Sequence, residues 1–361
     1  TFELLIEDAA HAQPASLLAD ISTTGPRLFS MVLTAGETFA YRAQGENVWQ
    51  LYGADLSYQA EFYGYNPNFN QFTAQQTGIY YLVLSSDYSA TPTNATLELR
   101  AITERTNSLV LGTAVSGDLD ATVRDVYTFT LAADQSVVLD VQDVVPGLDG
   151  VRWTLMRDGV VVNTGSWYYA YADGSSNPVL NLAAGNYELQ LNSNGAHYGF
   201  RLLDLVSAPA LVAGAPISGM IVPGEAIVLR FDAAAGAAIV YSPTDLGGPV
   251  VGGEGGSALQ GYWRLVDSSG LVISDWNSIS NGVVERNLDL ITDTYYFIWD
   301  TDTYGGEPAT TYSFDFKVAA PVAAQPLALN TPTSGTLGDD LTLSYQIQAT
   351  EASFLWLDAL S

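Results

Sequence analysis

The fold is decided between Leu109 and Leu205, where three runs follow one another: Asp125-Val-Tyr-Thr-Phe-Thr-Leu131, Gly185-Asn-Tyr-Glu-Leu-Gln-Leu191 and Tyr198-Gly-Phe-Arg-Leu202. Apolar and polar residues alternate in each run, which is the period of a strand with one buried face. The pair Asp158-Gly159 lies between two further apolar runs and predicts a hairpin with a type I′ turn. We therefore predict an all-β domain, an antiparallel β-sandwich of about seven or eight short strands.

The opening of this stretch recurs along the chain. The pattern L-x-x-[GDN]-x-x-x-[ST]-G occurs at 17–25, 109–117, 211–219 and 327–335. These intervals are the size of a domain and are too long for a solenoid repeat. We therefore expect tandem β-sandwiches, divided as follows: a closing strand and linker at 1–16, units at 17–102, 103–205 and 206–319, and a linker with an incomplete fourth unit at 320–361.

The two ends of the chain do not form whole units in this pattern. Thr1-Phe-Glu-Leu-Leu-Ile6 is similar to a closing strand, and the residues after Leu327 are similar to the first strands of a unit. Two explanations are open. The sequence is a window cut from a longer array, or neighbouring copies of the protein complete its ends by strand addition.

Charge and composition limit the possible partners. Among 361 residues, 39 are acidic and 12 are basic, which gives a formal charge of −27, and Lys317 is the single lysine. Such a surface repels phosphate groups, so we expect neither nucleic acid nor an anionic membrane as a partner. No apolar run reaches the roughly 18 to 20 residues of a membrane helix, so we expect no membrane insertion.

The absence of cysteine excludes disulfides and thiolate metal sites in this sequence. A cysteine-free chain is compatible with a reducing compartment or with export. The acidic, lysine-poor and Gly/Asp/Thr-rich composition favours an exported bacterial protein, so we expect an extracellular or cell-surface location.

The order of motifs between 109 and 205 resembles the bacterial pre-peptidase C-terminal (PPC) domain family. The resemblance lies in Ser116-Gly117, the D-x-Y-x-F run at 125–129, the D-G hairpin, the A-G-x-Y-x-L-x-L run at 184–191 and the final Y-x-F-x-L strand. It extends to 211–319 and, more weakly, to 17–102. This resemblance implies a jelly-roll-like β-sandwich that is non-catalytic, appended to secreted proteases or strung along large surface proteins and adhesins.

Catalytic chemistry has almost no support in the sequence. There are two histidines, His11 and His197, no cysteine, and no G-x-S-x-G elbow around a serine. Pairs of carboxylates are frequent because the chain is acidic, and their spacing does not separate an acid/base pair from solvated loops. We therefore expect no enzyme activity in this segment.

Calcium is the cofactor that the acidic clusters suggest. One cluster is Asp118, Asp120 and Asp125, and the other is Asp300, Asp302 and Glu307 in a glycine-containing loop. Clustered oxygen ligands in a turn are what Ca²⁺ requires. Neither cluster matches an EF-hand loop, and solvated acidic turns are the alternative interpretation.

Aromatic residues form the second candidate site. They gather in two stretches, and the candidate ligand-binding or interface residues are Tyr58, Phe62, Tyr63, Tyr65, Trp167, Tyr169 and Tyr171. Aromatic faces beside amide side chains hold sugars, and they also pack modules against each other. Packing in the core or at a sheet edge, contact between modules or subunits, and binding of a glycan or an extracellular protein all stay open.

The sequence therefore predicts a non-catalytic, structural repeat segment of a large exported surface, adhesin or filament-type protein. Its partners would be copies of itself or neighbouring repeats. The alternative is a set of substrate-docking modules, binding carbohydrate or protein, in a secreted hydrolase.

Overall fold

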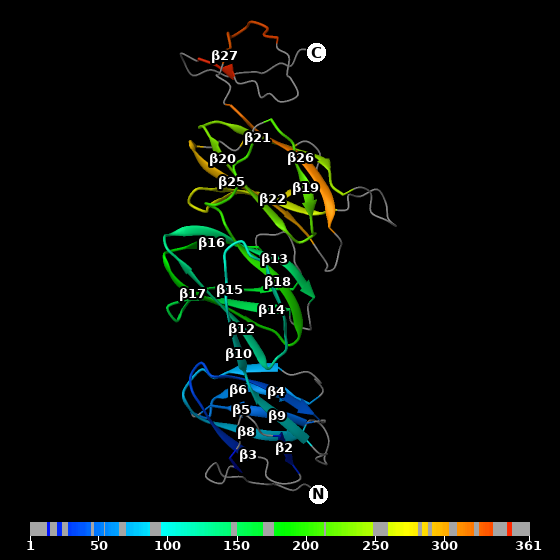
Figure 1. Ribbon diagram of the computed structural model, residues 1–361. Helices are drawn as coiled ribbons and strands as arrows, with labels where there is room; N and C mark the ends of the chain where they lie inside the picture. Colours follow the sequence, from blue (N-terminus) through cyan, green and yellow to red (C-terminus); the bar gives the residue numbers. More distant parts are fainter. Residues whose placement is uncertain are drawn as a thin grey trace. The chain divides into compact units, whose positions relative to one another are not determined.

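A computed structural model describes the following residues: 13–14, 20–23, 28–44, 47–53, 55–64, 70–86, 95–145, 150–168, 177–212, 214–247, 259–280, 284–287, 291–302, 309–320, 325–334 and 345–348. Its regular elements there are β-strands arranged in mainly antiparallel sheets (Figure 1), which confirms the predicted all-β class. No helix able to cross a membrane occurs in these ranges.

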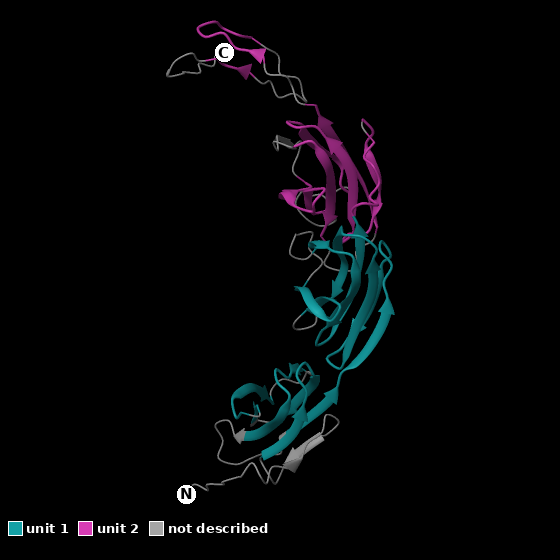
Figure 2. Ribbon diagram, turned by 90° about the vertical axis from the view of Figure 1, so that its left-hand side faces the viewer, with its two compact units in different colours: residues 1–204, 303–307 teal, residues 205–302, 308–361 magenta. Residues whose placement is uncertain are grey.

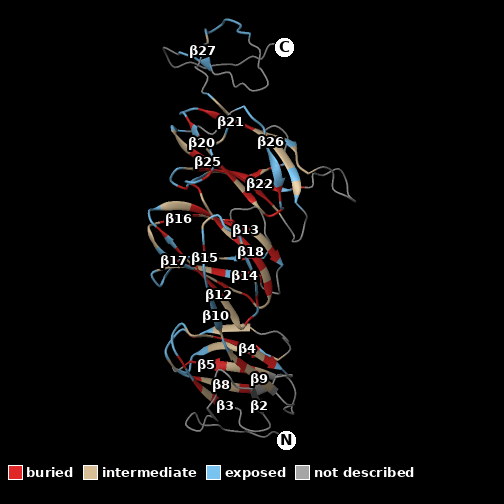
Figure 3. Ribbon diagram, in the orientation of Figure 1, coloured by how far each residue is buried: buried red, intermediate tan, exposed pale blue. Residues whose placement is uncertain are grey.

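The chain separates into two compact units (Figure 2). One comprises residues 1–204 with 303–307, and the other comprises residues 205–302 with 308–361. In the described residues the first unit holds two pairs of sheets and the second holds one such pair, each pair enclosing its own apolar core. Figure 3 shows the buried residues along the strands of these pairs. The predicted boundaries between units stay predictions.

The second sandwich, in the stretch that decides the fold, has a five-stranded and a four-stranded sheet. The first sheet has, in spatial order, β10 (Thr103–Ser108), β12 (Val123–Leu131), β17 (Gly185–Asn192), β14 (Val151–Arg157) and β15 (Val160–Trp167). The facing sheet has β11 (Val115–Leu119), β18 (Ala196–Asp204), β13 (Gln135–Val145) and β16 (Val179–Leu182). Alternate residues of β14 and β17 are buried, and the Phe129 and Tyr187 rings stack with centroids 5.2 Å apart.

The hairpin between β14 and β15 has the predicted turn. Asp158 and Gly159 both have positive φ, at 50° and 78°, as a type I′ turn requires. The two strands pair antiparallel from Val151 opposite Trp167 to Arg157 opposite Val160. This local prediction is confirmed.

The first sandwich repeats this arrangement. Its larger sheet has β1 (Gln13–Pro14), β3 (Leu28–Leu33), β8 (Gly78–Ser86), β5 (Asn47–Tyr52) and β6 (Tyr58–Tyr63). Its other sheet has β2 (Asp20–Thr23), β9 (Ala95–Ala101), β4 (Thr38–Gln44) and β7 (Asn70–Thr73). Fully buried aromatic side chains, among them Phe39 and Trp49, fill the space between the sheets.

The third sandwich has two four-stranded sheets. One has β20 (Ala226–Ala233), β25 (Asp293–Thr301), β22 (Gly261–Asp267) and β23 (Val272–Ser278). The other has β19 (Ile217–Ile221), β26 (Thr310–Ala319), β21 (Ala238–Asp245) and β24 (Val284–Asn287). Phe231 stacks on Tyr295 with ring centroids 5.7 Å apart, at the position that Phe129 and Tyr187 occupy in the second sandwich.

The segment that leads into each sandwich pairs parallel, which the antiparallel prediction missed. In the second sandwich Thr103 pairs with Val123, and in the third Ala210 pairs with Arg230, each twenty residues later. In the first sandwich β1 pairs parallel with β3. Two short strands near the C-terminus, β27 (Gln325–Pro326) and β28 (Tyr345–Gln346), repeat the parallel pairing and the twenty-residue offset. We call these four parallel segments the leading segments.

The repeated Ser-Gly motif has a steric explanation. Gly117 pairs with Tyr198 across β11 and β18, and a Cβ atom at Gly117 would lie 2.6 Å from the Tyr198 hydroxyl. In the third sandwich, a Cβ atom at Gly219 would likewise lie 3.0 Å from the Tyr312 hydroxyl. A glycine in an edge strand thus gives the tyrosine ring of the closing strand room to lie over it.

Candidate functional site

A buried carboxylate organises the polar cluster of the second sandwich. The Asp125 side chain on β12 is 2% exposed and accepts hydrogen bonds from Arg105 Nε and Nη2 at 2.6 and 2.7 Å. The Tyr198 hydroxyl on β18 also donates to it, and the Tyr127 and Tyr198 hydroxyl oxygens lie 2.7 Å apart. Arg105 Nη2 further donates to the Asp118 carbonyl oxygen at 2.8 Å. The cluster therefore joins β10 to both sheets.

The environment of the two tyrosines opposes their ionisation. Burial raises the pKa of Tyr198 far above its ordinary value, and its hydrogen bond to the Asp125 carboxylate raises this pKa further. Burial also raises the pKa of Tyr127. Both hydroxyls therefore keep their protons at neutral pH and act as hydrogen-bond partners within the core.

The predicted calcium ligands at the start of this sandwich are not brought together. The Asp118 carboxylate oxygen Oδ1 lies 2.8 Å from Nδ1 of the His197 ring, where it accepts a hydrogen bond when this nitrogen carries a proton. Asp120 accepts from the backbone N–H and hydroxyl of Thr122 at 2.7 and 2.6 Å. Asp125 has a guanidinium as its positive partner. Within the described ranges, no three His, Asp or Glu side chains form a group that could hold a metal ion.

The second acidic cluster is only partly described. Asp300 on β25 is fully buried, with Oδ2 3.7 Å from Nη2 of the equally buried Arg264 on β22. The backbone N–H of Asp302 donates to the Gln260 carbonyl oxygen at 2.8 Å. Glu307 lies outside the described residues. Calcium binding by this loop stays a prediction.

The aromatic candidates divide into core and surface residues. Phe62 and Trp167 are fully buried, so their predicted role in ligand binding or at an interface is wrong. Each of these two rings lies on the side of its strand that faces the opposite sheet, where burying a large ring stabilises the core. Tyr58 and Tyr63, on edge strand β6, are 54% and 39% exposed. Tyr65, Tyr169 and Tyr171 lie outside the described residues.

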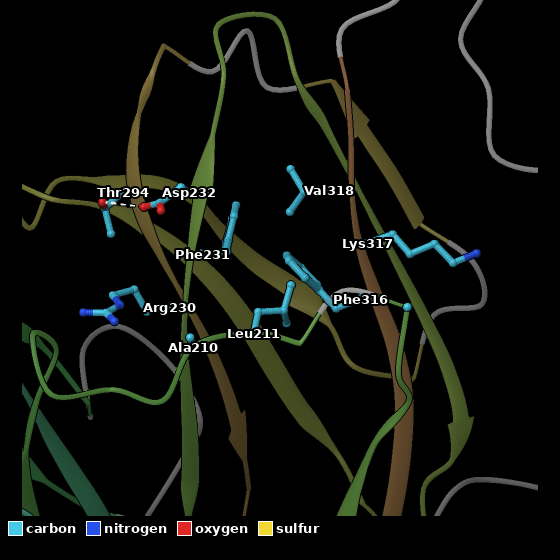
Figure 4. Close-up of a pocket in the computed structure, with 10 residues that line it drawn as sticks. Ala210, Leu211, Arg230, Phe231, Asp232, Thr294, Phe316, Lys317 and Val318 are labelled. Carbon is cyan, nitrogen blue, oxygen red and sulfur yellow. Dashed lines mark hydrogen bonds between the residues drawn. The ribbon is translucent and has the colours of Figure 1, made fainter.

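A cavity of about 760 Å³ opens between the sheets of the third sandwich (Figure 4). Its apolar wall comes from Leu211, Phe231, Phe316 and Val318. Arg230 and Lys317 lie on opposite sides of this wall. The Thr294 hydroxyl donates to the Asp232 carboxylate at its rim, over 2.7 Å. Its size falls in the range of about 300 to 1,000 Å³ that is usual for small-molecule sites.

Neither the ion pair nor the cavity was predicted from the sequence. Arg105 lies in Thr103-Glu-Arg-Thr-Asn-Ser108, whose side chains are all exposed, so no alternation of apolar residues identifies the strand. The available signal is the twenty-residue offset that the second and third sandwiches share between the leading segment and its partner strand. For the cavity, the signal is the appearance of Arg230 and Lys317 at positions where the second sandwich has Thr128 and Leu203.

Of the comparisons with known proteins, the comparison with solved structures is the one that finds similar chains. No protein-family model matches the chain, and a comparison with curated proteins finds no match. The pre-peptidase C-terminal domain of a collagenase from Bacillus anthracis is 23% identical, with 28% of this chain and 96% of that chain covered and a TM-score of 0.23.

Two further structures are similar in part. The periplasmic lysozyme inhibitor PliG from Aeromonas hydrophila is 13% identical over 28% of this chain and 99% of its own, with a TM-score of 0.20. The CUB1-EGF-CUB2 domains of rat MASP-1 are 8% identical over 59% of this chain and 100% of their own, with a TM-score of 0.20. Likenesses at this level carry no argument about what the chain binds or does.

We expect Arg105→Leu to lower the free energy of unfolding of the second sandwich by about 3 kcal/mol, because it leaves the buried Asp125 carboxylate without its cation. Arg124→Leu is the matched control, since Arg124 pairs with the more exposed Glu104 across the same two strands, and it should cost at most about 1 kcal/mol. Urea denaturation measures both. Equal losses in the two variants would contradict a special role for Asp125.

The raised pKa of Tyr198 and Tyr127 predicts a loss of stability at alkaline pH. Tyrosines in the unfolded chain lose their protons near pH 10, whereas Tyr198 and Tyr127 in the folded protein keep them. The contribution of these two residues to the free energy of unfolding is therefore complete below about pH 10 and falls as pH rises. Urea denaturation between pH 8 and 11.5 should show this fall, and Tyr198→Phe should make it shallower. Spectrophotometric titration of the folded protein showing every tyrosine ionising near pH 10 would contradict it.

Proposed function

We propose that this segment is a non-catalytic array of PPC-like sandwiches from an exported bacterial protein of the surface, adhesin or filament type. Its role is mechanical, as a spacer that holds other parts of the protein or other copies of it at a distance. The observation that supports this role most strongly is that β10, the leading segment of the second sandwich, is a strand of its sheet. The joint between the first two sandwiches is therefore built structure, unlike a flexible linker.

The joint between the first two sandwiches consists of strand. β9 ends at Ala101 and β10 begins at Thr103, so a single residue, Ile102, separates a strand of the first sandwich from a strand of the second. β10 then pairs along all six of its residues with β12, and Arg105 ties it to the buried Asp125. Bending at this joint would break ladder hydrogen bonds or the ion pair.

The segment that leads into the third sandwich is anchored to that sandwich. Leu205 and Ala208 are buried, although both belong to a connecting stretch. The Arg230 N–H donates to the Pro209 carbonyl oxygen at 2.9 Å, and the Leu211 N–H donates to the Arg230 carbonyl oxygen at 2.7 Å. These two hydrogen bonds hold the segment from Pro209 to Leu211 against β20 of the third sandwich.

The chemistry of the described residues supports a non-catalytic role. His197 is the histidine within these ranges, and it lies between two surface carboxylates, with Nδ1 2.8 Å from Asp118 and Nε2 3.7 Å from Asp143. Serine hydroxyls make no hydrogen bond to this ring in the described part of the chain. A nucleophile and its base are not assembled there. The proposal of export rests on the cysteine-free, acidic and lysine-poor composition.

A distance measurement between the first two sandwiches tests the mechanical role. Since the chain has no cysteine, Val32→Cys and Glu188→Cys allow clean spin labelling on two described strands. We expect a narrow distance distribution by pulsed electron resonance. Inserting Gly-Ser-Gly-Ser after Ile102 should broaden it by about 10 Å, the span of such a linker. The same insertion between Asp158 and Gly159 is the control and should leave it narrow. A broad distribution in the uninserted protein would reject a rigid spacer.

Docking to a carbohydrate or protein substrate is the second candidate function. It is favoured by the exposed Tyr58 and Tyr63, which lie on one edge strand with Glu61 between them, whose carboxylate accepts from the Tyr63 hydroxyl. Exposed aromatic faces beside polar groups suit sugar rings. Protein ligands with an apolar surface are the other possible occupants of this edge.

Glycan-array binding tests this second candidate. We expect binding to at least one neutral oligosaccharide and its loss, by about tenfold or more, in the Tyr58→Ala/Tyr63→Ala variant, because two stacking rings of a few tenths to 1.5 kcal/mol each are removed. Tyr168→Ala is the control, since Tyr168 is 50% exposed in the second sandwich. Binding that survives the double variant, or no binding at all, would exclude this edge as a glycan site.

A further inference from the structure

A small polar cleft lies where the first sandwich meets the second, within the first compact unit. Its volume is about 240 Å³. Residues of β4 and β7 in the first sandwich form one wall. The other wall belongs to the second sandwich and comes from β14, the end of β17 and the turn that follows β17. The cleft is therefore lined by both sandwiches.

Hydrogen bonds between the two sandwiches hold the walls of this cleft together. The Gln71 side-chain amide on β7 donates to the Ala121 carbonyl oxygen of the second sandwich at 2.8 Å. Asn194 Nδ2, in the turn after β17, lies 3.4 Å from Asn70 Oδ1 on β7, a weaker contact of the same kind. The walls thus meet through specific side chains, and the cleft belongs to the joint.

Arg152 supplies the positive charge of the cleft. It lies on the exposed side of β14, between the buried Val151 and Trp153. Within the described part of the chain it makes neither an ion pair nor a hydrogen bond. Other arginines of this unit pair with carboxylates, namely Arg42 with Glu98, Arg105 with Asp125, Arg124 with Glu104 and Arg201 with Asp140. The Arg152 guanidinium is thus available for an external acid, which it can bind through two parallel hydrogen bonds.

The rest of the described lining is polar and uncharged. It includes the side-chain amides of Asn70, Gln71, Asn192 and Asn194. Amide groups both donate and accept hydrogen bonds, so they suit the hydroxyl groups of a ligand. The described lining therefore combines one cation with several groups that recognise hydroxyls, in a chain of formal charge −27.

The common fold does not require these residues. Strand register places Tyr262 and Asp300 of the third sandwich at the positions that Arg152 and Asn192 have in the second. A carboxylate in the third sandwich thus stands where the second has a neutral amide beside its arginine. The cation and the amide are features of this joint.

We propose that this cleft binds a small hydroxylated acid, such as a sugar acid, with its carboxylate at Arg152 and its hydroxyl groups at the side-chain amides. The cleft is smaller than the roughly 300 Å³ at which sites for drug-sized ligands begin, so it fits a ligand of about one sugar ring. Because both sandwiches line the cleft, a bound ligand connects them across the joint. The site does not depend on the mechanical role proposed above.

A matched pair of ligands tests the proposal on the whole chain. D-Glucuronate and D-glucose share a hydroxylated ring, and glucuronate adds a carboxylate. In nuclear magnetic resonance titrations at constant ionic strength, we expect glucuronate to bind at one site and glucose to bind at least about tenfold more weakly. Arg152→Gln should weaken glucuronate by about tenfold and leave glucose unchanged. Arg157→Gln is the control, since Arg157 lies on the same strand beside Asp158 and outside the described lining.

An insertion at the joint tests whether both sandwiches form the site. Gly-Ser-Gly-Ser after Ile102 separates the two walls and should weaken glucuronate by about tenfold, whereas the same insertion between Asp158 and Gly159 should leave its affinity unchanged. Circular dichroism checks that each variant is folded. No binding of glucuronate, equal binding of both ligands, or unchanged affinity in Arg152→Gln or in the joint insertion would overturn the proposal. The affinity decides this site and the width of the distance distribution decides the spacer, so the two proposals can fail separately.

Discussion

The parallel pairing of each leading segment constrains the rest of each sandwich. In the second sandwich the chain runs from β10 in one sheet to β11 in the facing sheet and returns to β12, which lies beside β10. Parallel neighbours need a crossover between them, and here β11 is part of that crossover. One short stretch of chain therefore joins both sheets and begins the module. In the second sandwich, loss of this pairing would detach β10, which follows the last strand of the first sandwich after a single residue.

The few basic residues strengthen this arrangement where the chain is most acidic. Arg105 pairs with the buried Asp125, and Arg201 Nε donates to the fully buried Asp140 at 2.6 Å. Buried pairs of this kind contribute little net stability compared with apolar residues, but breaking one leaves a costly charge. They therefore specify which strands pair. With 12 basic residues against 39 acidic ones, the few cations that pair with buried carboxylates leave the chain strongly acidic.

Local chemistry made part of the fold predictable. Asp158-Gly159 allowed the type I′ hairpin to be predicted, and alternation placed Tyr127, Tyr187 and Leu191 in the core, where they are buried. The repeated Ser-Gly motif was found in the sequence, but not its reason: Gly117 lies within β11 and is needed for contact with the ring of Tyr198, far away in sequence. A local pattern does not reveal such a contact.

The candidate sites were less predictable, since proximity in sequence does not establish proximity in space. Asp118 and Asp125 are neighbours along the chain, yet the exposed Asp118 meets a histidine and the buried Asp125 an arginine. For Phe62 and Trp167, aromatic clustering left core packing, an interface and ligand binding open, because clustering does not reveal which side of a strand faces the opposite sheet; both rings are buried.

Because one chain contains repeated sandwiches, equivalent positions can be compared to separate the residues that the common fold requires from those that it does not. The second and third sandwiches share the stacked Phe–Tyr pair, the Gly–Tyr contact and the leading segment, and a common scaffold requires these features. Where the two sandwiches have different residues at an equivalent position, the common scaffold does not require a particular side chain there. Phe316, Lys317 and Arg230 differ together around one opening, although they come from two strands of different sheets. Packing explains an enlarged ring at Phe316, which faces the core, whereas the two cations lie on the outward sides of their strands, where the scaffold sets no requirement for the side chain.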